Sequence, residues 1–180
     1  IEATGRGHRV TLFDMAPQLG GRARKVEVDG LALDNGQHIL VGAYTQTLAT
    51  MRRVGVDPEA VLLRLPLRLV GPDGRGLVLR AGGPRAAFVR AVCAHPGWRW
   101  SDRAALLAAT ARWSWRGFRC AEELSVAQLT RGLTPAVRRE LIEPLCVAAL
   151  NTPAPEASAS VFLRVLRDAL FGGPGASDLL

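Results

Sequence analysis

Cysteine pairs and long apolar runs are both missing from this sequence. The three cysteines, Cys93, Cys120 and Cys146, lie far apart, form no CxxC pair and have no neighbouring pair of histidines. This spacing excludes the usual zinc sites and a disulfide framework, so we expect no metal and free thiols in a reducing cytoplasm. No run of about 18 uncharged apolar residues occurs, and the sequence therefore predicts no membrane-spanning helix.

Lysine is almost absent as well. Lys25 is the single lysine among 23 basic residues, and the formal net charge is +7. The arginines are scattered singly or in pairs, whereas nucleic-acid surfaces gather their charge in one segment or on one face, so we expect no nucleic-acid partner. The preference for arginine with abundant Ala, Gly and Leu is typical of a GC-rich, bacterial genome. A basic face toward anionic lipid fits better, and we expect peripheral contact with membrane lipid.

The first residues resemble half of a nucleotide-binding unit. Residues 6–14 form a short apolar stretch of the kind buried in a parallel sheet and end at Asp14, and residues 2–4 can be the last turn of a helix capped by Gly5 or Gly7. This order predicts the second half of a βαβ unit. We expect its first half, with the glycine-rich phosphate turn, to be encoded before Ile1.

Further along the chain, strands give way to helices. Hairpins are predicted over 24–34, around Asp29-Gly30, and around Pro72-Asp73-Gly74, with a helix over 43–54 between them. Four helices are then predicted at 84–94, 102–116, 135–150 and 156–171, beginning near Ser101-Asp102, Thr134-Pro135 and Pro155-Glu156 for the last three. The composition changes near residue 82 or slightly earlier. We therefore predict an α/β chain with one domain over 1–65 and a second over 66–180.

Two segments have the residue types that hold a dinucleotide. An acid that ends the second strand of such a fold accepts hydrogen bonds from ribose hydroxyls, which is the role predicted for Asp14. Gly20 and Gly21 allow backbone N–H groups to approach an anion, and Arg22 can pair with phosphate. Each feature alone is also compatible with an ordinary surface residue or turn.

The order of these features along the chain indicates a protein family more specifically than any one feature does. A strand ending in an acid, a short loop, the sequence GGRA, a hairpin and a D-x-G turn resemble, in this order, the amine-oxidase and phytoene-desaturase superfamily of flavoproteins. The resemblance implies a partial FAD-binding Rossmann-like domain followed by part of a helix-rich substrate domain. It implies FAD as the cofactor, with Asp14 at the adenosine ribose and Gly20, Gly21 and Arg22 beside the pyrophosphate and flavin. The superfamily more often has Glu at the position of Asp14.

Two longer stretches narrow the resemblance. Residues 33–44 (LDNGQHILVGAY) and 144–173 are similar to the hydroxysqualene dehydroxylase family, also called squalene-associated FAD-dependent desaturases. The similarity runs along essentially the whole chain. It implies an apolar isoprenoid substrate and the reductive removal of a hydroxyl from hydroxysqualene in squalene and hopanoid synthesis. That family has a longer chain, which returns to the FAD domain after the point where this sequence ends.

The first of these stretches also contains candidate site residues. Gly36 and Gln37 are expected near the flavin ring or the substrate entrance, because glycine permits close backbone approach. His38 is a candidate proton donor to a departing hydroxyl, since the ordinary pKa of histidine suits acid catalysis. The alternative is a neutral histidine that is hydrogen-bonded within the turn between hairpin and helix.

All four tryptophans, Trp98, Trp100, Trp113 and Trp115, lie within one short segment among arginines. Two interpretations are open: an interfacial patch, where amphipathic rings meet lipid headgroups, or core filling between helices. A very apolar substrate comes from lipid, so we expect a cytoplasmic protein in peripheral contact with the inner face of the cytoplasmic membrane. Two other functions compete with the dehydroxylase: a carotenoid desaturase or isomerase, and a non-catalytic helical binding module on a degenerate flavin fold.

Overall fold

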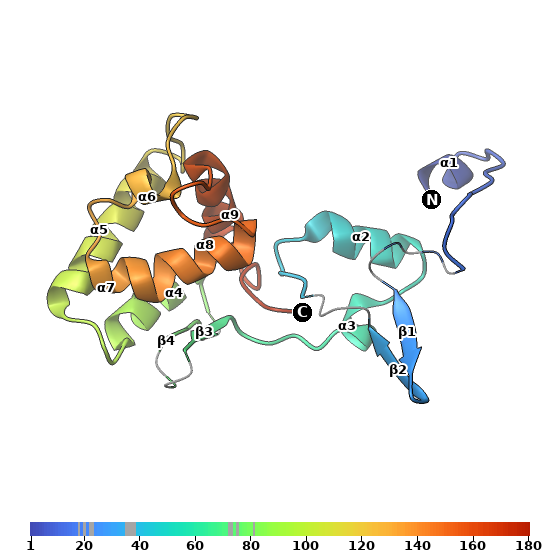
Figure 1. Ribbon diagram of the computed structural model, residues 1–180, viewed down its shortest axis with the longest axis horizontal. Helices are drawn as coiled ribbons and strands as arrows, with labels where there is room; N and C mark the ends of the chain where they lie inside the picture. The colour runs from blue at the N-terminus through green and yellow to red at the C-terminus, as the bar shows by residue number, and fades with distance from the viewer. Residues whose placement is uncertain are drawn as a thin grey trace.

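The computed structural model describes residues 1–17, 19, 21, 24–34, 39–71, 74, 76–80 and 82–180. Its elements form two groups that lie side by side (Figure 1). The first group contains α1 (Glu2–Gly5), the hairpin β1 (Lys25–Val28) and β2 (Leu31–Asp34), α2 (Thr45–Arg53) and α3 (Pro58–Val61). The second contains the hairpin β3 (Arg68–Val70) and β4 (Gly76–Val78) and the helices from α4 onward. Both helices and strands are present, in agreement with the predicted α/β class.

The hairpin predicted over 24–34 is confirmed. Strands β1 and β2 pair antiparallel, with Val26 opposite Leu33 and Val28 opposite Leu31. Asp29 and Gly30 join them with φ angles of 51° and 78°. A two-residue turn with both φ angles positive matches the right-handed twist of the two strands, which explains the Asp-Gly sequence at this point.

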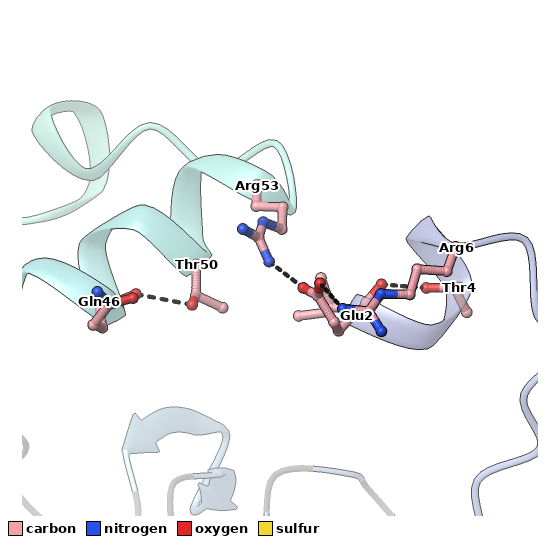
Figure 2. Close-up of polar contacts among 7 residues, drawn as sticks. Glu2, Thr4, Arg6, Gln46, Thr50 and Arg53 are labelled. Carbon is pink, nitrogen blue, oxygen red and sulfur yellow. Dashed lines mark hydrogen bonds and ion pairs between the residues drawn. The ribbon is translucent and has the colours of Figure 1, made fainter.

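The strand predicted over 6–14 is not observed as a paired strand. No strand of the described residues runs beside this segment, and the side chains of Val10, Leu12 and Phe13 are exposed. An apolar run of this kind becomes a buried strand only when neighbours supply hydrogen bonds on both edges. The helical turn predicted before it is present as α1, and Glu2 joins that turn to α2 through Arg53, at 2.6 Å (Figure 2).

The helices of the second group follow the predicted positions with shifts at their starts. Helix α4 spans Pro84–Ala94, as expected. Helix α5 spans Trp100–Trp115 and begins earlier than predicted, because Asp102 lies in its first turn, where its carboxylate accepts the backbone N–H of Arg99 at 2.8 Å. The last helix begins later, at Ala159. The remaining helical elements are α6 (Val126–Leu129), α7 (Pro135–Val137), η1 (Arg138–Ile142), α8 (Glu143–Leu150) and α9 (Ala159–Phe171).

The helix predicted over 135–150 has a widened turn in its middle. Thr134 caps its start, η1 is a π-helical turn, and α8 continues to Leu150. Pro144 explains the widening. Its nitrogen has no hydrogen to donate and its ring collides with the carbonyl four residues earlier, so the regular α-helical bond cannot form there.

The apolar core belongs to the second group. Side chains from α4, α5, α9 and the β3–β4 hairpin interlock, with Phe162, Leu163 and Val92 fully buried at the centre. In the described part of residues 1–65, by contrast, the only buried side chains are Leu48 and Pro58. The first group therefore depends on contacts with the rest of the molecule, whereas the second has a core of its own.

Candidate functional site

Asp14 lies in an exposed loop after the unpaired segment. One of its carboxylate oxygens, Oδ1, accepts the backbone N–H of Ala16 at 2.8 Å. This local bond fixes the direction of the side chain. The second oxygen faces no hydrogen-bond donor among the described residues and is available to a hydroxyl group of a ligand.

Gly21 is the second predicted cofactor residue that the structure describes. Its φ angle is 59°, and no atom lies within 4 Å of the position that a Cβ would occupy. Open space beside a left-handed residue suits the close approach of a phosphate group. The other predicted site residues, Gly20, Arg22, Gly36, Gln37 and His38, lie outside the described residues.

The segment that follows His38 is anchored to the end of the chain. Backbone hydrogen bonds join Leu40 to Leu180 in both directions, at 3.0 and 2.8 Å, and Gly42 donates to the carbonyl of Asp178 at 2.8 Å. On its other side, the same terminal segment exchanges two backbone bonds of 2.8 Å between Leu65 and Leu179. We call residues 39–43, 64–65 and 175–180 together the junction. It lies between the two groups of elements (Figure 1).

Two features of the junction depend on particular side chains. A Cβ on Gly42 would collide with the carbonyl of Gly175, so only glycine fits where these backbones cross. Arg64 donates to Asp178 at 3.1 Å, and to Glu59 and the Gly175 carbonyl at 3.4 Å each. Sequence reasoning missed Arg64, Asp178 and Gly42. Asp178 lies 114 residues from Arg64 along the chain, and Gly175 is similarly far from Gly42, so no local pattern marks either pair.

The interior of the helical group offers no room for a large ligand. A cavity of about 20 Å³ lies beneath the β3–β4 hairpin and is lined by apolar side chains, with the hydroxyl of Thr110 as the polar exception. That hydroxyl donates to the carbonyl of Leu106 at 2.8 Å. The volume suffices for about one water molecule. A ligand larger than about one water molecule would therefore have to bind at a surface of this group and not in this cavity.

Helix α8 provides an apolar surface of that kind. Cys146 and Leu145 face inward, and Pro144, Val147 and Ala148 are exposed, with Val147 at 50 %. No charged residue occurs from Pro144 to Pro155. On the buried side, the Cys146 thiol donates to the carbonyl of Thr152 at 3.3 Å, and burial raises the pKa of this thiol. After Glu143, which is exposed in its first turn, the exposed side of α8 is uncharged, while the inner side holds the helix in place.

Neither a metal cluster nor a membrane-spanning helix is found in the part of the chain that the structure describes. No group of three or more His, Cys, Asp or Glu side chains in these residues could hold a metal ion. No helix there has the length and apolarity needed to cross a bilayer.

Comparison with known proteins identifies relatives over nearly the full chain. Residues 4–170 match the family described as flavin containing amine oxidoreductase. The chain is 27 % identical to the hydroxysqualene dehydroxylase of Zymomonas mobilis subsp. mobilis and 26 % identical to that of Sinorhizobium fredii. Each match covers 96 % of this chain and 41 % of the relative. The chain thus spans about two fifths of the length of the curated relatives it matches.

Proposed function

Because the chain belongs to the flavin-containing amine oxidoreductase family, we propose that it is part of an FAD-dependent oxidoreductase acting on an apolar isoprenoid. The proposed reaction is the reductive dehydroxylation of hydroxysqualene to squalene. The observation that carries this proposal is the similarity to two bacterial proteins named hydroxysqualene dehydroxylase, which extends over 96 % of the chain. The exposed apolar residues Pro144, Val147 and Ala148 on α8 support an apolar ligand.

In this proposal, residues 1–65 belong to the FAD-binding domain and residues 66–180 to the substrate domain. Asp14 has a carboxylate oxygen available for a ribose hydroxyl, and Gly21 has open space for a phosphate, so both fit the cofactor. Gly20 and Arg22 would bind beside the pyrophosphate, and Gly36 and Gln37 near the flavin ring. The bound flavin supplies the two electrons that the reaction consumes.

The proposed reaction replaces a carbon–oxygen bond with a carbon–hydrogen bond. Two electrons and two protons are consumed, and the oxygen leaves as water. We assign to the imidazole of His38 the proton that the departing hydroxyl takes up. Replacing His38 by Gln keeps a polar side chain but removes the titrating group. We expect this variant to bind FAD normally and to lose both most of the turnover and the alkaline-side dependence of turnover on pH, because a proton donor must be protonated to act; a purely structural His38 would leave the pH profile unchanged.

Val147 and its neighbours on α8 are proposed to contact the isoprenoid chain. A charge at this position would have to be desolvated each time the substrate binds. Val147→Glu should therefore raise KM for the substrate while leaving flavin binding intact. The matched control is Val161→Glu on α9, because Val161 is equally exposed, at 49 %, and is assigned no role.

The direction of electron flow tests the proposed reaction. The full-length protein is loaded with FAD, the flavin is reduced photochemically without oxygen, and hydroxysqualene is added, so that no physiological reductant is needed. We expect the oxidised flavin spectrum to return together with one equivalent of squalene, identified by mass spectrometry.

Each alternative function gives a different result in this experiment or when the oxidised protein is mixed with a carotenoid precursor. A carotenoid desaturase would leave hydroxysqualene untouched, and its oxidised flavin would be bleached by phytoene. A carotenoid isomerase would convert its substrate without a net change of the flavin. A non-catalytic module would bind no flavin at all. Any of these three outcomes contradicts the proposed dehydroxylation.

A further inference from the structure

The outward side of α5 is apolar along its entire length. Residues at helical spacing, Trp100, Ala104, Ala108, Ala111 and Trp115, are all exposed, and we call them the α5 outer face. Trp100 is 75 % exposed and Trp115 is 87 % exposed. Fifteen residues separate the two rings, which places them roughly 22 Å apart along the helix axis. Large exposed rings at both ends of one helix face are unusual on a surface that meets only water.

The other two tryptophans belong to the core, as one of the two interpretations of the tryptophan segment predicts. Trp98 and Trp113 are each 4 % exposed. The indole N–H of Trp98 donates to Glu140 at 3.0 Å, and its ring stacks on His95 at 4.2 Å between ring centroids. The core interpretation therefore applies to Trp98 and Trp113, and the interfacial interpretation concerns only Trp100 and Trp115.

Arginines outnumber acidic residues around the α5 outer face, and the exposed Glu122 and Glu123 follow only after the helix has ended. Asp102 is the single acidic residue from 97 to 121, and it is buried. At the start of the helix, the guanidinium of Arg103 lies 5.0 Å from the ring centre of Trp100 and donates to the carbonyl of His95 at 2.8 Å. The exposed ring is thus held next to a fixed positive charge.

A groove of about 410 Å³ lies near the other end of the helix, where α5 meets α6. Three arginines, Arg112, Arg116 and Arg119, line it, and Trp113 is part of its wall. In the described part of the chain, no carboxylate lies within 4.0 Å of these three guanidinium groups. Three unneutralised guanidinium groups around one groove attract an anion with several oxygens, such as a phosphate.

We propose that the α5 outer face docks on an anionic lipid bilayer, with the groove receiving lipid phosphate groups. Trp100 and Trp115 would lie at headgroup depth with α5 parallel to the bilayer plane, because an indole ring combines an apolar body with a polar N–H. In Figure 1, α5 is on the side of the helical group away from α1, α2 and α3, so docking leaves the proposed cofactor segments clear of lipid. This inference does not depend on which reaction the protein catalyses.

Vesicle binding tests the proposal without an activity assay. The full-length protein is sedimented with phosphatidylcholine vesicles of increasing phosphatidylglycerol content. We expect binding to rise with the anionic fraction, to weaken in high salt and to shift tryptophan fluorescence toward shorter wavelengths. Removal of the three groove arginines (R112A, R116A and R119A) should weaken binding roughly fivefold per residue, on the order of a hundredfold in total. The double variant W100A/W115A should weaken it by about tenfold or more and abolish the fluorescence shift.

Matched control variants distinguish the effect of this surface on vesicle binding from the effects of net charge and of exposed apolar side chains in general. The triple variant R68A/R80A/R85A removes the same charge from exposed positions on β3, after β4 and on α4, and L63A removes an apolar side chain that is 73 % exposed. Both should bind vesicles nearly as the unmodified protein does. The proposal is overturned by failure to bind any anionic vesicle, by equal binding to pure phosphatidylcholine, by unchanged binding of either α5 variant, or by an equal loss in the controls. A partner protein or another segment of the full-length chain covering α5 would produce the first of these results.

Discussion

The guanidinium of Arg64 lies 3.1 Å from the carboxylate of Asp178, although 114 residues separate them in sequence. Both side chains are partly buried, at 35 % and 26 % exposure. The same arginine reaches the carbonyl of Gly175. Arg64, which follows the last helix of the first group, is therefore hydrogen-bonded to residues 175–178, which follow the last helix of the second group.

We expect Arg64→Ala to lower the free energy of unfolding by about 1–2 kcal/mol, because it removes several hydrogen bonds that water screens only in part. A double-mutant cycle with Asp178→Ala should give a coupling energy of about 0.5–1 kcal/mol in urea unfolding. Arg6→Ala is the control, since its ion pair with Glu2 is well exposed and should contribute little. A coupling energy of zero would mean that the Arg64–Asp178 contact does not stabilise the junction.

Gly42→Ala should cost more than an ordinary surface substitution. The added methyl group collides with the Gly175 carbonyl, and both backbones must move apart; overpacking of this kind costs about 1–3 kcal/mol. Gly5→Ala is the matched control, because nothing lies within 4 Å of its Cβ position, and its effect should be small or stabilising. The melting temperatures of both variants test this prediction. Equal melting temperatures would contradict the close contact between Gly42 and the Gly175 carbonyl.

Asp14→Asn tests the proposed cofactor contact. The asparagine retains an oxygen for the N–H of Ala16, but its amide nitrogen cannot accept a ribose hydroxyl, and the charge is lost. FAD affinity of the full-length protein should fall by roughly 1.5–3 kcal/mol, or about ten- to a hundredfold. Glu27→Gln removes one charge from an exposed position on β1 and should leave Kd unchanged in the same fluorescence titration. Unaltered affinity in Asp14→Asn would make Asp14 a simple loop residue.

The carboxyl group of Asp102 makes the free energy of unfolding depend on pH in a direction that can be predicted. The Thr134 hydroxyl and the Arg99 backbone N–H, in that order of importance, lower the pKa of this carboxyl. A group whose pKa is lower in the folded state stabilises the protein above its unfolded pKa, and this stabilisation is lost as the pH falls through the folded pKa. Asp102→Asn should therefore destabilise the protein at pH 7, and the difference from the unmodified protein should shrink in acid. A difference that is constant with pH would argue against the charged capping interaction.

Local chemistry made much of this fold predictable. The Asp29-Gly30 pair specifies its hairpin, and Thr134 and Pro135 mark a helix start where one is found. The family assignment from the motifs is confirmed by the match over residues 4–170. The exposure of two tryptophans also follows from helix geometry, because Trp113 and Trp115 are two positions apart and so point to nearly opposite sides of α5.

Long-range contacts were not predictable in the same way. The segment over 6–14 has the composition of a buried strand, but its state depends on pairing partners that no local pattern reveals. The junction could not be predicted for the same reason, because the close contact of Gly42 with Gly175 depends on two backbone segments that are far apart in sequence. The roles of Arg22, Gly36 and His38 remain predictions, because those residues lie outside the described ranges.

The junction has a consequence for the order in which the molecule is made. Residues 39–43 are synthesised before the segment that they bond, around Asp178, which follows about 136 residues later, on the order of ten seconds at typical translation rates. During that interval the described part of residues 1–65 has only Leu48 and Pro58 to contribute to a core, while the helices from α4 onward can begin to pack together. The backbone bonds of the junction can therefore form only after α9 and the segment that follows it have been synthesised.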